Sequence, residues 1–278
     1  MSDLKLSAAD VKKLRDATGA GMMDCKKALT EAGGDFDKAI EVLRKKGQKL
    51  SAKRADREAN EGVVIAQING DKTRGVVVKL SCETDFVAKN DDFVNMTKKI
   101  ADMAINEFPE TKDALLDLPF EGISLRDKIT EQIGVIGEKV ELADYERIEA
   151  PMVVKYIHMG NKAGVLVALN KADDAFENPG KDVAMQVAAM KPIALNKESI
   201  PQEIIDKELE IGKEIAMKEG KPEAMLEKIA TGKLNKYFKE NTLLAQAFVK
   251  NNKQSVEAYL KSVDGELTVT DFKHVKLG

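Results

Sequence analysis

Few side chains in this chain could perform covalent chemistry, and their spacing does not suit it. The only histidines and cysteines among the 278 residues are His158, His274, Cys25 and Cys82. A nucleophilic pair of Cys82 and His158 would need a third group to orient the imidazole and a site for the oxyanion, and the sequence marks neither. The cysteines lack the CxxC spacing of a zinc or redox site, so we expect both to be small buried side chains.

The glycine-rich stretches do not complete a nucleotide site either. Gly19-Ala-Gly21 is followed by Lys26 without the spacing of a phosphate-binding loop, and residues 160–164 lack the dinucleotide-binding fingerprint. We therefore predict a protein that is not an enzyme, with no catalytic residue, no cofactor and no metal.

The most distinctive segment is Cys82-Glu-Thr-Asp-Phe-Val87, which directly follows the apolar run 75–80. That run predicts a buried strand, and the residues after it end the strand, so we expect Asp85 and Phe86 at a rim on a rigid support. A rim aromatic is suited to wedge into another protein. A Phe after a strand also often folds back to cap its own core, and these residues alone leave both interpretations open.

Composition indicates a folded protein but does not reveal its partner. Charged residues make up 33% of the chain and hydrophobic residues 43%, which is typical of a soluble protein rather than a disordered one. Lys and Arg total 44 against 47 Asp and Glu, so the net charge of −3 gives no general attraction to nucleic acid. The N-terminus lacks the apolar stretch of a signal peptide, and the longest uncharged apolar run, 163–170, is too short to span a bilayer. We expect a cytoplasmic protein that does not bind membranes.

Residues 1–55 predict three short helices that form a module like a ubiquitin-associated domain. We expect the first helix to begin with Ser7 and Asp10 and to end at Gly19–Gly21. The second spans about 23–32, and the third begins after Asp35 and ends at Gly47. Fifty residues make a core that is small for catalysis but sufficient for docking. Met22 and Met23 follow a glycine-rich turn, where we expect exposure of at least one thioether that adapts to a partner. The alternative places both in the core.

Residues 48–60 predict a solvated, partly helical linker. Its basic residues are Lys49, Lys53, Arg54 and Arg57, which alternate with small and acidic residues. A nucleic-acid interface would be better supported by interleaved aromatics and a basic domain, so we consider nucleic-acid binding only as an alternative.

An internal repeat follows this segment. Residues 64–80 match residues 153–169 at a constant offset, because 153 and 64 differ by as much as 164 and 75. Each copy predicts a β-hairpin followed by a helix, which indicates two related α+β subdomains. In the second copy, Asp173-Asp-Ala175 stands where the first has Thr84-Asp-Phe86, although Phe176 follows.

Residues 201–238 predict a helical hairpin inserted after the second copy. Apolar residues recur at helical spacing on both arms, and Gly220-Lys-Pro222 turns the chain between them. We expect the arms to pair as a short antiparallel coiled coil, with flat packing on the body as the alternative. A helix at 254–262 and a strand at 267–272 are expected to complete the second subdomain.

These patterns predict an α+β fold, divided along the chain. The expected divisions are an N-terminal docking module (1–55), a first core subdomain (56–145), a second core subdomain (146–198 and 239–278) and the inserted hairpin (199–238).

Two strings make the chain resemble the bacterial elongation factor Ts family. They are Thr84-Asp-Phe-Val-Ala-Lys-Asn90 and Leu14-Arg-Asp-Ala-Thr-Gly-Ala-Gly-Met-Met-Asp-Cys-Lys-Lys-Ala-Leu29. The resemblance extends over essentially the whole chain, including the inserted hairpin and the segment Tyr156-Ile-His158 before the second apolar run.

The resemblance implies a guanine nucleotide exchange factor of translation elongation, whose partner is the GTPase elongation factor Tu. Asp85 and Phe86, flanked by Thr84 and Val87, would enter between two helices of the partner's nucleotide domain and disturb its magnesium and phosphate site. Three residues match family positions that contact the same domain, namely Arg15, Met22 and Met23, and His158 lies on a segment that also faces the partner. The competing interpretation is an RNA-binding or ribosome-associated accessory protein.

Overall fold

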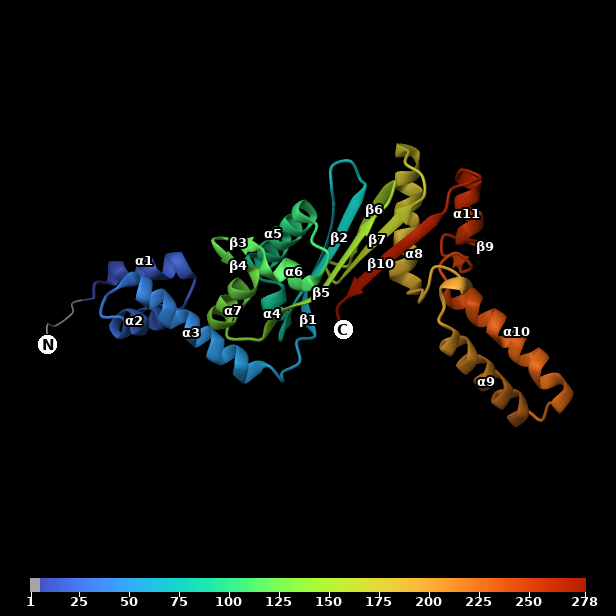
Figure 1. Cartoon of the computed structure of the whole chain (residues 1–278), viewed down its shortest axis with the longest axis horizontal. Helices are drawn as coiled ribbons and strands as arrows, with labels where there is room; N and C mark the ends of the chain where they lie inside the picture. The colour runs from blue at the N-terminus through green and yellow to red at the C-terminus, as the bar shows by residue number, and fades with distance from the viewer. Residues whose placement is uncertain (1–5) are drawn as a thin grey trace. The chain divides into compact units, whose positions relative to one another are not determined.

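The computed structural model describes residues 6–278. These residues form two compact units, each made of segments that are separate in the sequence. Unit 1 comprises residues up to 65, 78–145 and 276–278, and unit 2 comprises 66–77 and 146–275. Figure 1 shows the element order by colour, from blue helices near the N-terminus to the red C-terminal strand. The fold is mixed α and β, as the sequence predicts.

Unit 1 begins with three helices, α1 (Ala8–Thr18), α2 (Met22–Glu31) and α3 (Phe36–Arg54). The predicted caps form: the Asp10 amide donates to Ser7 Oγ at 3.1 Å, and Gly19 ends α1 with a φ of 71°. The Lys38 amide donates to the Asp35 carboxylate at the start of α3. The helices share a small core that includes Leu14, Cys25, Ala28, Leu29 and Ala39.

Gly47 does not end the third helix, which corrects the prediction from the sequence. α3 runs through Gly47 to Arg54 because this glycine meets another glycine, Gly134, on α7 (Leu125–Ile136). A Cβ at Gly47 would lie 2.7 Å from the carbonyl oxygen of Thr130, closer than any side chain can approach. The glycine therefore permits close helix crossing instead of marking a helix end.

Residues 48–54 continue α3, and most residues from 48 to 58 are exposed, in line with the predicted solvated and partly helical segment. The Arg54 side chain is only 23% exposed and contacts Glu83, whereas the Arg57 side chain is 61% exposed. An ion pair between Arg44 Nε and Glu131 at 2.6 Å lies one turn before the glycine crossing of α3 and α7. The positive charges of this segment therefore serve the fold, at least in part.

The remaining elements of unit 1 surround this helix pair. α5 (Asp91–Glu107) is capped by Asn90 and buries one stripe, which includes Phe93, Ile100 and Ala104. The short elements are α4 (Asp85–Ala88), α6 (Lys112–Asp117), β3 (Pro119–Phe120) and β4 (Ile123–Ser124). α7 was not predicted, although its ends carry local signals: Ser124 accepts the Asp127 amide at its start, and Gly137 ends it in a left-handed conformation.

Two three-stranded sheets carry the predicted repeat. One has the strand order β1 (Glu61–Ile68), β2 (Arg74–Cys82), β5 (Val140–Glu149), and the other has the order β10 (Val269–Lys276), β7 (Ala163–Leu169), β6 (Met152–His158). β6 and β7 pair antiparallel from Met152 with Leu169 to His158 with Ala163. The two predicted hairpins are therefore confirmed, and the C-terminal strand completes the second sheet, beginning two residues and ending four residues later than expected.

The core of unit 2 lies between its sheet and α8 (Glu177–Met190). Every residue of β7 is buried, which accounts for its uninterrupted apolar sequence. The cluster also includes Leu260 of α11 (Val256–Val263) and Phe248 of β8 (Ala247–Phe248), which precedes β9 (Asn251–Ser255). Two 3₁₀ helices, Asp174–Phe176 and Lys197–Ser199, flank α8.

The inserted segment forms two helices, α9 (Gln202–Lys218) and α10 (Glu223–Asn241), which contact each other. Gly220 turns the chain with a φ of 73°, as predicted. A Cβ at Gly212 would lie 3.1 Å from the Cα of Ala230, so small residues allow the helices to approach closely. Ile215 is exposed, and Ala216 takes the buried position beside it.

Candidate functional site

The segment after β2 presents one aromatic side chain to solvent. Thr84 caps the four-residue helix α4 by accepting a hydrogen bond from the Val87 amide, and Phe86 stands on the second position of that helix. The Phe86 side chain is 82% exposed. An exposed ring of this size offers a large apolar contact area to a protein partner.

The matching segment of the second copy provides an internal comparison. Asp173 caps a short 3₁₀ helix there, just as Thr84 caps α4, but the position equivalent to Phe86 is Ala175. The aromatic one residue later, Phe176, is only 9% exposed and belongs to the core of unit 2. The alternative interpretation, in which the aromatic caps its own core, therefore describes Phe176 and not Phe86.

Asp85 places a carboxylate beside the exposed ring. Its Oδ2 lies 2.6 Å from Lys89 Nζ, one turn further along, and this hydrogen bond holds the pKa of Asp85 below its usual range. Val87 is partly buried and anchors the opposite side of the short helix. The turn thus presents a negative charge and an apolar ring next to each other.

Cys82 at the end of β2 is not an activated nucleophile. Burial, followed by the nearby Glu138 charge, raises the pKa of Cys82 to about 12, so the thiol stays protonated at neutral pH. The Sγ donates to the Thr84 carbonyl oxygen at 3.2 Å, which supports the turn. Cys25 is also buried, as the sequence predicted for both cysteines.

The second group of predicted residues surrounds the turn between α1 and α2. Met22 is 46% exposed and Met23 is 64% exposed, so the alternative that places both in the core is wrong. Arg15 is also exposed, and its carbonyl oxygen accepts the Gly19 amide that ends α1. The turn therefore presents two thioethers and one guanidinium to solvent.

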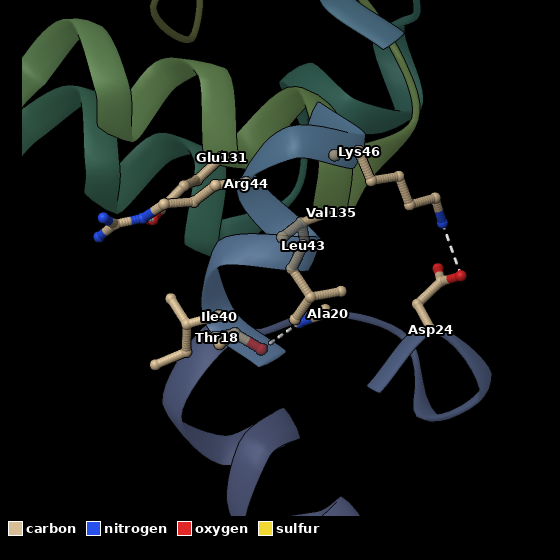
Figure 2. A pocket seen from close by; sticks show the side chains of 10 residues that line it. Thr18, Ala20, Asp24, Ile40, Leu43, Arg44, Lys46, Glu131 and Val135 are labelled. Carbon is tan, nitrogen blue, oxygen red and sulfur yellow. Dashed lines mark hydrogen bonds and ion pairs between the residues drawn. The ribbon is translucent and has the colours of Figure 1, made fainter. Parts of the chain in front are cut away.

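A small cavity lies beside this turn, where α3 meets α7 (Figure 2). Its lining is mostly apolar, and two ion pairs border it: Asp24 with Lys46 at 2.6 Å, and Arg44 with Glu131. Its volume of about 30 Å³ is far too small for a nucleotide or other cofactor. The cavity is a gap in the packing of α3 on the neighbouring elements rather than a ligand site.

His158 belongs to unit 2, where it is the last residue of β6. Its Nδ1 lies 2.9 Å from the Tyr156 hydroxyl, and the two rings are 5.8 Å apart between centroids. The structure thus places the eight predicted residues in three groups: Thr84 to Val87 on one turn, Arg15 with the two methionines around another, and His158 on a strand.

The described residues also limit other kinds of site. Between residues 6 and 278, no group of three or more His, Cys, Asp or Glu side chains is arranged to hold a metal ion. In the same part of the chain, no helix has both the length and the apolar character needed to cross a membrane.

Residues that support the Phe86 turn were not found from the sequence. Glu83 accepts hydrogen bonds from Arg54 and from the Lys139 amide, and Glu138 accepts them from the Glu83 and Thr84 amides. Glu83 and Glu138 are 55 residues apart, and neither belongs to a periodic pattern or a cap motif. Only the folded structure brings these carboxylates to one turn.

Phe86 is thus an exposed aromatic on an anchored turn, an arrangement suited to contact with another protein. The comparisons with known proteins identify the family. Residues 83–278 match the model of the family described as elongation factor TS. The proteins named elongation factor Ts from Christiangramia forsetii and Flavobacterium psychrophilum are 58% and 53% identical, over 99% and 98% of this chain and 99% of theirs. A third, from Amoebophilus asiaticus, is 51% identical over 99% of this chain and its full length. The chain belongs to the elongation factor Ts family.

Proposed function

We propose that this chain promotes release of GDP from elongation factor Tu by inserting Phe86 into the nucleotide domain of that GTPase. Membership of the elongation factor Ts family supports the role of nucleotide exchange in translation elongation. The observation that carries the mechanism is the 82% exposure of Phe86 on a capped and anchored turn. No covalent step is required of the factor itself.

Exchange follows from differential binding. A factor that binds the nucleotide-free GTPase more tightly than the GDP-bound form must weaken GDP binding by the same coupling free energy. Asp85 and Phe86 enter between two helices of the nucleotide domain, where the ring separates apolar contacts and the carboxylate acts on the magnesium site. A negative charge close to a bound cation and its phosphates changes the local electrostatics directly.

The barrier reduction needed for exchange can be divided between Phe86, Asp85 and the other contacts with the GTPase. Accelerating GDP release by about 10⁴ requires lowering the barrier by about 5.5 kcal/mol. Transfer of the exposed Phe86 ring into an apolar cleft supplies about 2–3 kcal/mol of that amount. Asp85 and the remaining contacts with the GTPase supply the rest.

The other predicted residues would hold the partner in place. Arg15, Met22 and Met23 dock a helix of the nucleotide domain from a ubiquitin-associated-like module at 1–55, and His158 contacts a second region of the partner. The hairpin at 199–238, as an antiparallel coiled coil, reaches the partner's more distant domains. The two core subdomains, 56–145 and 146–198 with 239–278, carry these elements, and no small-molecule substrate is bound.

Release of fluorescent GDP from elongation factor Tu tests the proposal. Catalytic amounts of this chain should accelerate release many-fold, with each molecule acting on many GTPase molecules in turn. An equal amount of heat-denatured chain serves as the control. Absence of acceleration, together with retention of RNA that weakens steeply with salt, would favour the RNA-binding alternative instead.

A further inference from the structure

The turn that carries Phe86 is held by hydrogen bonds to Glu138, a residue outside the turn. Glu138 Oε2 accepts the amides of Glu83 at 3.1 Å and Thr84 at 3.0 Å, and Glu138 Oε1 accepts the Thr84 hydroxyl at 2.7 Å. Three hydrogen bonds to one charged group fix the backbone immediately before α4. The hydroxyl that caps α4 is therefore itself held in position.

Glu83 forms a second set of hydrogen bonds that holds the same turn. Its Oε1 accepts Arg54 at 2.5 Å and the Lys139 amide at 2.6 Å, and its Oε2 lies 3.3 Å from Arg57. Burial raises the pKa of Glu83, but the Lys139 amide and the Arg54 guanidinium outweigh it, so the pKa lies below the usual range. The carboxylate is thus ionised at neutral pH and accepts bonds from both sides.

The hydrogen bonds of Glu83 and Glu138 connect the turn to the ends of the helices α3 and α7. Arg54 is the last residue of α3, and Gly137 ends α7 in a left-handed conformation directly before Glu138. The Lys139 ammonium also donates to the carbonyl oxygen of Ala55, just beyond α3. Because α3 and α7 cross closely at their glycines, the turn is braced by a pair of rigid helices.

The second copy of the repeat lacks this arrangement. The position that matches Glu83 is Ala172, and the position that matches Phe86 is Ala175. A short capped helix therefore forms there without a carboxylate at the position of Glu83. The carboxylate and the exposed ring occur together in the first copy only, although the hairpin and helix of the scaffold do not require either.

We propose that Glu83 and Glu138 are positioning residues for nucleotide exchange, which set the direction of Phe86 before the partner arrives. This inference rests on the proposed function. A braced ring avoids the entropy cost of ordering the turn during insertion, so its binding energy acts on the partner's nucleotide site. A loosened ring would spend part of that energy on its own ordering.

The test compares maximal GDP release at saturating factor for Glu138→Ala and for Glu110→Ala, a control at an exposed glutamate of the same unit. We expect Glu138→Ala to lower the maximal rate about 10- to 30-fold, the loss that corresponds to about one hydrogen bond to a charged group. Glu138→Gln should recover most of the rate, since its amide oxygen can accept both backbone amides. Glu110→Ala should match the wild type.

A double-mutant cycle separates positioning from a general loss of structure. If Glu138 acts through the ring, Glu138→Ala should have little further effect once Phe86→Ala has been introduced. An equal loss in both backgrounds would overturn the proposal. If Phe86→Ala alone leaves stimulated release unchanged, the proposed insertion of Phe86 fails. If Phe86→Ala is impaired and Glu138→Ala is normal, only the positioning role fails.

The two arginines that contact Glu83 give a matched pair that does not alter Glu138. Arg54→Ala removes the more buried contact and should lower maximal release several-fold, whereas Arg57→Ala removes an exposed contact and should change it less than about twofold. This pair also decides the question if Glu138→Ala does not fold. Equal maximal release rates for both arginine variants would refute the positioning role of Glu83.

Discussion

Truncation of Phe86 should separate function from stability, and the repeat supplies its control. Phe86→Ala removes a ring that is already 82% exposed, so the free energy of unfolding should change by less than about 0.5 kcal/mol. Phe176→Ala removes a ring from the core of unit 2, at 9% exposure, and should cost about 3–5 kcal/mol. Truncation of the aromatic after each β-hairpin should therefore leave stability nearly unchanged at Phe86 and lower it strongly at Phe176.

For nucleotide exchange, Phe86→Ala should have the larger effect and Phe176→Ala the smaller one. Loss of most of the about 2–3 kcal/mol of Phe86 burial at the interface lowers GDP-release stimulation by about 10- to 100-fold for Phe86→Ala. Phe176→Ala should keep near-normal stimulation per folded molecule, at a temperature where the variant is still folded. Asp85→Ala should lower stimulation less than Phe86→Ala.

Both quantities can be measured on the same samples. Circular dichroism gives the melting temperature, and stopped-flow release of fluorescent GDP from elongation factor Tu gives the stimulated rate. The reasoning is refuted if Phe86→Ala melts many degrees lower while its exchange per folded molecule is normal. That result would mean that the ring stabilises its own fold instead of acting on the partner.

Two further predictions concern stability. A methyl group at Gly47 would lie too close to the Thr130 carbonyl oxygen, so Gly47→Ala should lower the free energy of unfolding by about 1–2 kcal/mol even after its gain in helix propensity. Gly232→Ala in α10, where a methyl group meets nothing within 4 Å, should raise the free energy of unfolding by up to about 1 kcal/mol. Urea titrations measure both, and a change of the same sign in the two variants would contradict this account. Lys181 and Lys72 lower the pKa of Glu177 from 4.5 to about 2, so its contribution is complete above pH 4.5 and is lost as the pH falls toward 2. Glu177→Gln should therefore lose less stability than the wild type across that interval, and identical acid titrations would show that the ion pairs contribute nothing.

Much of the local structure could be predicted because its signals are short-range. The cap at Ser7, the turn at Gly220 and the β-hairpins of the repeat depend on residues within a few positions of each other. The string from Thr84 to Val87 contains its own helix cap, so its conformation is also local. The sequence by itself therefore determined where the candidate site lies and which residue types it presents.

Only the tertiary structure decided what surrounds that string. Gly47 could be a helix end or a helix crossing, and the choice depends on Gly134, which is distant in the sequence. Exposure of Phe86 and burial of Phe176 depend on the packing around each copy, since both follow similar strands. The hydrogen bonds from the Glu83 and Thr84 amides to Glu138 join residues separated by four helices and two short strands. No periodicity records such a contact, because a side-chain hydrogen bond needs only proximity in space.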